Sequence, residues 1–284
     1  MTTLVTGTSG KLGRLVVLSL LERGVPAGEV VATARDTSKI VDLADRGVHV
    51  RHADYSDPGS LKEALAGVDK VMLVSSSEVG QRLAQHRNVI DAAGEAGVEL
   101  FGYTSVTRAQ SSSLALAAEH RQTEDYLARS GLAHVLLRNS WYIENYTEQI
   151  SQALAEGVVR GAAGSGRVSA ATRADYAAAA AVVLTEPGHA GQVYELGGDA
   201  FTVAEYAAVV AEKSGRAISY EDLSPKAYSE VLVSAGLPPA VAELLADSDR
   251  GINGGELFVD TGDLERLLGR PVTTLADAVA TALS

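Results

Sequence analysis

In the first half of the chain, short apolar runs alternate with longer stretches in which apolar residues recur at helical spacing. Runs of this length and β-branched content predict buried strands. The predicted strands are 4–6, 30–34, 48–52, 71–74, 100–103 and 135–137, and the helical patterns cover 11–22, 60–65, 80–94 and 115–130. Strands that alternate with helices predict an α/β, Rossmann-type doubly wound parallel sheet.

The pattern changes after residue 139. A helix through 155 precedes a glycine-rich stretch, an alanine-rich helix begins near 175, and one more strand is expected at 193–196. From residue 202 the chain is mostly helical, and Thr202 and Glu205 have the spacing of a capping box. Further elements are expected as a small strand at 218–220, helices at 224–236 and 239–247, an exposed loop at 250–255 and a last helix from 274.

This change divides the chain into two predicted parts. Residues 1–144 plus 171–198 form an NADP-binding Rossmann domain, and residues 145–170 plus 199–284 form a smaller, mostly helical C-terminal lobe that binds substrate.

Charge and composition narrow the possible functions. The chain carries 36 acidic and 24 basic side chains, a net charge of −12, which disfavours nucleic acid and anionic membrane surfaces as partners. It has no cysteine, which excludes disulfides and thiolate chemistry, and its six histidines show no metal-ligand spacing. We therefore expect a cytoplasmic protein without a metal and without a membrane segment.

Three glycines, Gly7, Gly10 and Gly13, follow the first predicted strand and open the first predicted helix. Glycines at such a turn let a pyrophosphate approach the backbone amides of a helix N-terminus. The predicted cofactor turn comprises Gly7, Thr8, Ser9, Gly10, Lys11, Leu12 and Gly13. The alternative is a turn that serves only the tight packing of strand against helix.

The residues at the ends of other strands indicate which dinucleotide binds. Arg35 ends the second strand, where a cation meets the 2′-phosphate of NADPH, although the neighbouring Asp36 weakens the distinction from NADH. Asp54 is placed to bond adenine, and Ser75, Ser76 and Ser77 to approach a ribose. For Arg35 the alternative is a solvated charge, and for the others a capping or turn residue.

A tyrosine–lysine pair typical of alcohol dehydrogenases is missing, since none of the ten tyrosines has a lysine four residues later. The absence favours a delocalised acceptor that takes a hydride without a dedicated acid. The weak catalytic candidates are Tyr103, His120 and Tyr142, and for His120 a structural hydrogen bond is the stronger alternative. The carboxylates Glu119, Glu124 and Asp125 are interpreted as a solvated helix face.

Aromatic and amide side chains gather after the sixth strand. This segment, residues 138–146, contains the only tryptophan, Trp141, together with Tyr142, Tyr146, Asn139 and Asn145. Flat aromatic walls with a few amides suit a planar ring stacked over a nicotinamide. The alternative is a hinge packed between the two parts of the chain.

Several strings in the chain resemble the NmrA-like family of atypical short-chain dehydrogenases and reductases, and within it the bacterial type 2 NAD(P)H:quinone oxidoreductases, with triphenylmethane reductases as near relatives. They are T-G-T-S-G-K-L-G at 6–13, S-S-S-E-V-G-Q-R at 75–82, Q-H-R-N-V-I at 85–90, Y-T-S at 103–105, L-L-R-N at 136–139, W-Y at 141–142, E-N-Y at 144–146, A-T-R-A-D-Y at 171–176, A-D-S-D at 246–249 and T-T-L-A at 273–276.

The resemblance implies NADPH, a cytoplasmic protein and a homodimer, and no flavin is expected because the sequence shows no flavin-specific element. It adds these cofactor-binding residues: Asn139, Ser140, Trp141, Tyr142, Ile143, Glu144 and Arg173. The acceptor, a quinone or similar planar electrophile, would contact Tyr103, Trp141, Tyr142 and Asn145. Ser140 replaces an expected glycine and is predicted to narrow the acceptor pocket. Two alternatives are a non-catalytic regulator that senses dinucleotides and a reductase of dyes or azo compounds.

Overall fold

Seven parallel strands form the central sheet of the computed structural model, which describes residues 1–78 and 80–284. Their spatial order is β3-β2-β1-β4-β5-β6-β8. The strands are β1 Thr3–Val5, β2 Val30–Ala34, β3 His49–His52, β4 Lys70–Leu73, β5 Leu100–Val106, β6 His134–Asn139 and β8 Val193–Leu196. The predicted doubly wound sheet is confirmed, and its order reverses between β1 and β4. Val79, within the S-S-S-E-V-G-Q-R string, lies outside the described residues.

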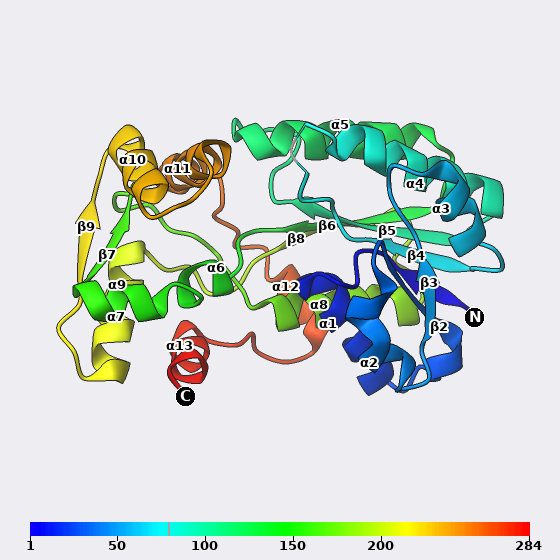
Figure 1. Ribbon diagram of the computed structural model, residues 1–284, viewed down its shortest axis with the longest axis horizontal. Coiled ribbons are helices and arrows are strands. Elements are labelled where there is room, and N and C mark those ends of the chain that lie inside the picture. The colour runs from blue at the N-terminus through cyan, green and yellow to red at the C-terminus, as the bar shows by residue number, and fades with distance from the viewer. Residues whose placement is uncertain (79) are drawn as a thin grey trace.

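Helices cover both faces of this sheet (Figure 1). One layer contains α3 Pro58–Ala64, α4 Arg82–Ala96 and α5 Ala115–Arg129, and the other contains α1 Lys11–Glu22, α2 Val41–Ala44, α8 Arg173–Thr185 and α12 Asp263–Leu268. Alternating strand residues supply the two cores. Leu4 and Val31 pack in the core on the α3–α5 side, whereas Val5 and Ala32 pack in the core on the α1 and α8 side.

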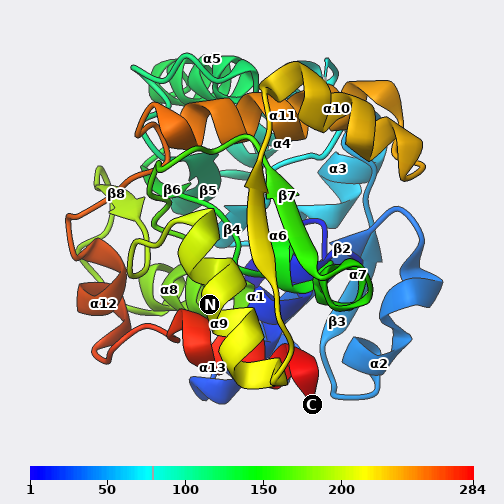
Figure 2. The same cartoon turned by 90° about the vertical axis from the view of Figure 1, so that its left-hand side faces the viewer.

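The remaining elements form a smaller lobe beside the sheet, in which β7 and β9 pair in parallel (Figure 2). Its elements are α6 Glu144–Thr147, α7 Ile150–Glu156, β7 Val158–Gly161, α9 Val203–Ser214, β9 Ser219–Asp222, α10 Pro225–Ser234, α11 Pro239–Asn253 and α13 Leu275–Leu283. Two short 3-10 helices, η1 Ala27–Glu29 and η2 Thr37–Ile40, flank β2. The predicted capping box is present, with Thr202 accepting from the Glu205 amide at 3.1 Å and Glu205 accepting from the Thr202 amide at 2.7 Å.

The loop predicted at 250–255 is wrong for most of its length, because α11 continues to Asn253. Gly251 and Ile252 are buried, and a Cβ on Gly251 would collide with the side chain of Leu114. Glycine at this position therefore lets α11 contact the segment just before α5. The polar composition of the segment does not indicate burial that comes from so distant a part of the chain.

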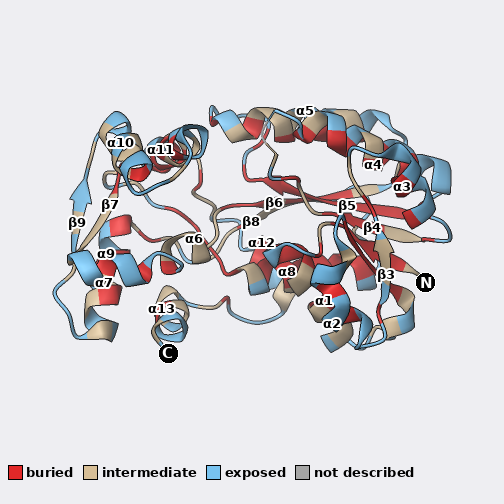
Figure 3. Ribbon diagram, viewed as in Figure 1, coloured by how far each residue is buried: buried red, intermediate tan, exposed pale blue. Residues whose placement is uncertain are grey.

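Burial is concentrated in the sheet and in the helix faces turned toward it (Figure 3). Leu264 of α12 and the following Val272 join the core formed by α1 and α8. Asp175 at the start of α8 is fully buried and accepts hydrogen bonds from Arg270 at 2.8 Å and from the Thr273 amide at 2.9 Å. Residues 263–273 thus pack with the sheet, although the predicted boundaries placed all of 199–284 in the lobe. Within the described residues, no helix has the length and apolar character needed to cross a membrane.

Candidate active site

A cavity of about 660 Å³, called here the strand-end cleft, opens at the carboxyl ends of β1, β2 and β4. This is the edge where the strand order reverses, the usual binding position in doubly wound sheets. The cleft is lined by Gly7, Ser9, Gly10, Lys11, Leu12, Gly13, Ala34, Arg35, Ala53, Asp54, Tyr55, Val74, Ser75, Ser76, Ser77, Glu78, Arg82, Gln85, Tyr142 and Arg173. The predicted cofactor residues that follow β1, β2, β3 and β4 therefore lie together in the folded protein.

The glycine turn forms one wall of the cleft. Gly7 has φ +62°, a conformation that side chains disfavour, and a Cβ on Gly13 would lie 2.5 Å from the Gly7 carbonyl oxygen. The turn leads directly into α1, whose free N-terminal amides favour an anion. Thr8 does not line the cleft, because its amide and its hydroxyl both donate to the Thr33 carbonyl at 3.0 Å. It joins the turn to β2.

Charged side chains lie together at the end of the cleft near β2. The Arg35 guanidinium contacts a Glu78 carboxylate oxygen at 2.7 Å, and Gln85 donates to the other oxygen at 2.8 Å. Arg35 is 66% exposed, so a solvent-borne anion can reach it. Asp54 accepts from the Ser56 amide at 2.8 Å and also lines this end.

The loop from Ser75 to Glu78 is held in place by α4. The Ser76 amide donates to His86 Nε2 at 2.9 Å, and Arg82 Nε donates to the Ser76 carbonyl at 2.8 Å. Burial lowers the pKa of His86 to about 3, so the ring stays neutral and Nε2 remains an acceptor. His86 Nδ1 then carries the proton shared with Thr123 at 3.1 Å. Sequence reasoning did not assign Arg82 or His86 a role, although both lie in the strings that carry the family resemblance.

Tyr103 and His120 are buried between the sheet and α5 and do not line the strand-end cleft. The Tyr103 hydroxyl lies 2.6 Å from His120 Nδ1, and the Tyr103 ring packs edge-on against His86 at 5.3 Å. Burial raises the pKa of Tyr103 and lowers that of His120, so both stay neutral. The prediction that Tyr103 contacts the acceptor does not fit this position, and His120 makes the structural hydrogen bond that was the stronger alternative.

The interpretation of the α5 carboxylates as a solvated face is wrong for two of the three. Glu124 is 3% exposed and binds Arg138 through both carboxylate oxygens, at 2.9 and 2.6 Å. Glu119 accepts from Arg82 at 3.1 Å. Their charge is therefore matched by arginines from β6 and α4, which the spacing on α5 alone does not show.

The segment from 141 to 149 contributes residues both to the strand-end cleft and to a second cavity in the lobe. Tyr142 and Arg173 line the cleft, with the Arg173 guanidinium 4.9 Å from the centre of the Tyr142 ring. Trp141 and Asn145 line the second cavity instead. Arg173 donates to Asn145 Oδ1 at 3.1 Å, so one hydrogen bond joins the linings of the two cavities.

Four other predicted cofactor residues, in or next to this segment, line neither cavity. Ser140 is buried and donates to the Leu257 carbonyl at 2.8 Å, so its hydroxyl faces away from both cavities and the predicted narrowing is wrong. Ile143 belongs to the lobe core, and Glu144 accepts from the Arg173 amide at 2.8 Å. Asn139 is buried, and its Oδ1 has no hydrogen-bond partner among the described residues.

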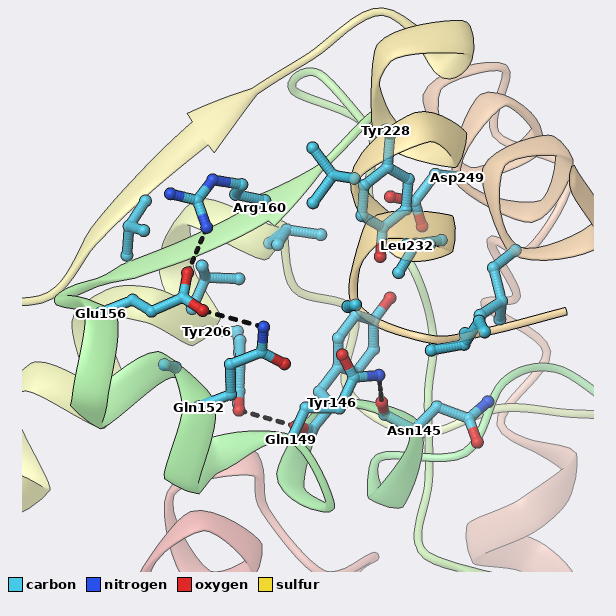
Figure 4. A pocket seen from close by; sticks show the side chains of 18 of the residues that line it. Asn145, Tyr146, Gln149, Gln152, Glu156, Arg160, Tyr206, Tyr228, Leu232 and Asp249 are labelled. Carbon is cyan, nitrogen blue, oxygen red and sulfur yellow. Dashed lines mark hydrogen bonds and ion pairs between the residues drawn. The ribbon is translucent and has the colours of Figure 1, made fainter. Parts of the chain in front are cut away.

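The second cavity, called here the lobe cavity, has a volume of about 100 Å³ (Figure 4). Its lining comprises Trp141, Asn145, Tyr146, Gln149, Gln152, Ala153, Glu156, Val158, Val159, Arg160, Val203, Tyr206, Tyr228, Val231, Leu232, Ala235, Leu237, Leu245 and Asp249. Apolar side chains dominate its walls, and polar groups lie at two ends. The volume admits one small ring.

The strand-end cleft has the features that a dinucleotide requires. It combines a glycine cradle at a helix N-terminus, serine side chains on a fixed loop and an accessible guanidinium. These residues would hold NADPH. Among the residues that the structure describes, no group of three or more His, Asp or Glu side chains could hold a metal ion.

Comparison with known proteins identifies relatives along the whole chain. The chain is 50% identical to quinone oxidoreductase 2 of Escherichia coli (strain K12) over 277 residues, covering 97% of this chain and 96% of the relative. A crystal structure of an NADPH-dependent quinone oxidoreductase from E. coli complexed with NADPH matches with a TM-score of 0.96 and 49% identity, covering 100% of both chains. A Citrobacter sp. triphenylmethane reductase complexed with NADP(H) matches with a TM-score of 0.95 and 36% identity, covering 99% of this chain and 100% of that one.

The family assignment rests on the same extent of chain. The NmrA-like family matches residues 1–269, which include the glycine turn, the loop held by α4 and the A-T-R-A-D-Y string. The chain therefore belongs to the NmrA-like family, as its sequence strings predicted.

Proposed function

We propose that this protein is an NADPH-dependent oxidoreductase that reduces a quinone by hydride transfer without a flavin. The observation that carries the proposal is the strand-end cleft, in which a glycine turn, the N-terminus of α1 and Arg35 meet. The quinone-reducing relatives from E. coli, similar over the full chain, support the choice of acceptor.

Each part of the cleft is assigned to one part of NADPH. The glycine turn and α1 bind the pyrophosphate, and Arg35 binds the 2′-phosphate after exchanging Glu78 for the more highly charged phosphate. Asp54 contacts the adenine, Ser75–Ser77 contact a ribose, and Tyr142 with Arg173 borders the nicotinamide half. The groups that contact NADPH are positioned by predicted residues outside the lining of the cleft, which are Thr8, Asn139, Ser140, Ile143 and Glu144.

The acceptor is placed in the lobe cavity, against Trp141 and Asn145. When bound, NADPH supplies the hydride, and the chain's own residues orient the two reactants and exclude water. Trp141 offers a flat apolar wall, while the bond from Arg173 to Asn145 fixes the boundary between cofactor and acceptor. In this proposal, residues 1–144 plus 171–198 bind the cofactor, and the lobe binds most of the acceptor. The protein is proposed to act as a homodimer.

A second candidate activity is the reduction of triphenylmethane dyes, favoured by the 36% identity to the Citrobacter enzyme. Both activities use the same hydride chemistry and differ in the size and charge of the acceptor.

The test is to mix the purified protein with NADPH or NADH and a small quinone, and to follow nicotinamide absorbance without added flavin. Rapid oxidation of NADPH and slow oxidation of NADH support the proposal. If NADPH binds, as followed by its fluorescence, but no quinone or dye oxidises it, the protein is a dinucleotide sensor instead.

A further inference from the structure

The lobe cavity contains a carboxyl group whose burial is unusual for an acid without a cationic partner. Asp249, on α11, is 8% exposed, and its Oδ2 accepts a hydrogen bond from the Ala162 amide at 2.7 Å. No salt bridge to Asp249 is present among the described residues. The absence of a counter-charge at a buried carboxyl favours its neutral, protonated form.

The surroundings of Asp249 contain further acids and phenols. Tyr146 of α6, Tyr220 and Asp222 of β9, and Tyr228 of α10 are the titratable groups that act on it or are influenced by it. Arg160 of β7 is the cation in the cavity lining, and it is bound by Glu156 at the other end and by Glu221 on β9. These neighbours leave Asp249 uncompensated, and burial raises its pKa to about 6.

Tyr146 supplies an independent sign of a missing ligand. Its hydroxyl is buried and has no hydrogen-bond partner among the described residues. A buried phenol without a partner loses a hydrogen bond that water would provide, so a ligand oxygen at this point satisfies it. Figure 4 shows Tyr146, Tyr228 and Asp249 at one end of the cavity, with Glu156 and Arg160 at the other.

We propose that Asp249 and Tyr146 form an oxygen-recognition subsite, in which the protonated carboxyl and the phenol donate hydrogen bonds to a carbonyl oxygen of an uncharged acceptor ring. The proposal rests on the acceptor-binding role given to the lobe cavity under the proposed function. Apolar walls from Val203, Leu232 and Leu245 would hold the ring itself. The subsite selects neutral carbonyl acceptors when Asp249 is protonated, and it favours a cationic ring when Asp249 is ionised.

The experiment measures the Kd of para-benzoquinone for the full-length protein saturated with NADP⁺, so that no turnover occurs. With a pKa of about 6 for Asp249, binding to the protonated form alone predicts weakening of roughly 90-fold between about pH 5 and about pH 8. The affinity for N-methylpyridinium, a cationic ring of similar size, is expected to increase as the pH rises from about 5 to about 8. A quinone Kd that does not change with pH would overturn the proposal.

Three variants separate recognition from structure. Asp249→Asn keeps an acceptor for the Ala162 amide and presents a permanent N–H donor, so its quinone Kd is expected to be independent of pH. Tyr146→Phe should weaken quinone binding severalfold and keep the pH dependence. Glu243→Gln, the matched control, changes an exposed acid on α11 that lines neither cavity, and it should keep both the affinity and the pH dependence of the wild type.

The outcomes also distinguish this subsite from the proposed function. If Asp249→Asn retains the wild-type pH profile while the wild type reduces quinones, the subsite is wrong and the proposed activity stands. If the wild type binds NADPH but never reduces a quinone, the activity itself is wrong. Should Asp249→Asn fail to fold, the opposite pH trends of the two probes and the Tyr146→Phe result still decide.

Discussion

The strand-end cleft and the lobe cavity share the 141–149 segment in their linings but are built in different ways. One wall of the cleft is the glycine turn, where the backbone itself lines the cavity, and short side chains such as Ser75 and Ser77 follow the end of β4. The lobe cavity is made of long side chains from helices and a strand far apart in sequence, including Tyr146, Tyr228 and Asp249. A site lined by backbone keeps its cofactor when side chains change, whereas a site lined by side chains can acquire a different acceptor when those side chains are substituted.

A side chain added to the glycine turn of the cleft tests whether the bare backbone there is needed to bind the cofactor. In Gly10→Val, the new Cβ would lie 3.2 Å from the Gly7 carbonyl oxygen, and because Gly10 lines the cleft, the branched side chain would occupy space there. We expect affinity for NADPH and NADH to fall equally, by roughly 100-fold or more, which is about 3 kcal/mol. Fluorescence titration measures this loss, with circular dichroism as the control for folding. Unchanged affinity in a folded variant contradicts the assignment of the cleft.

The next substitution separates the two dinucleotides. Arg35→Ala removes one charge-assisted contact to the 2′-phosphate, and because Arg35 is exposed the effect should lie near the low end of the usual range, about 1.5 kcal/mol or roughly 10-fold in Kd. NADH, which lacks that phosphate, should be nearly unaffected. Arg46→Ala, which removes an exposed cation outside the cleft, is the control. Equal losses for both dinucleotides show that Arg35 does not read the phosphate.

The contrast between the regions also explains what the sequence could predict. The glycine turn, Arg35 and Ser75–Ser77 are local features that follow successive strands, and the rule that parallel strands end at one edge brings them together. The lobe cavity depends on the contact between Asp249 of α11 and Ala162, which directly follows β7. The glycine-rich composition of the sequence up to residue 166 does not predict a strand at β7. Sequence reasoning named Tyr146 as part of an aromatic segment but had no means to pair it with Asp249.

Two specific failures have the same physical origin. Tyr103 and Glu124 were interpreted from their own elements, as a substrate contact and as a solvated acid. Their partners, His120 and Arg138, settle their roles, and both partnerships form only when α5 packs on the sheet. Burial of polar groups with distant partners is therefore the property that one-dimensional patterns miss.

A third prediction concerns the stability cost of the buried acid in the lobe cavity. The pKa of Asp249 is raised to about 6 from an ordinary value of 3.8, so the folded state binds its proton more tightly than the unfolded state. Its contribution to stability is complete below about pH 4 and is lost as the pH rises through 6. Asp249→Asn should therefore be more stable than the wild type at pH 8, by about 2–3 kcal/mol, with the difference absent near pH 4. Urea unfolding at both pH values measures this, and an equal difference at the two values contradicts it.

The smallest expected effect tests the segment between the two regions. Ser140→Ala removes one hydrogen bond to the Leu257 carbonyl, which still accepts from the Ser169 amide at 3.0 Å, so the unfolding free energy should fall by about 0.5–1 kcal/mol. Because the Ser140 side chain lines neither cavity, the KM values for NADPH and for the quinone should be unchanged. A lower Tm with unchanged KM values assigns Ser140 to the support of the segment. A change in the quinone KM alone would instead show that this position senses the acceptor, and the boundary between the strand-end cleft and the lobe cavity would have to be drawn closer to β6.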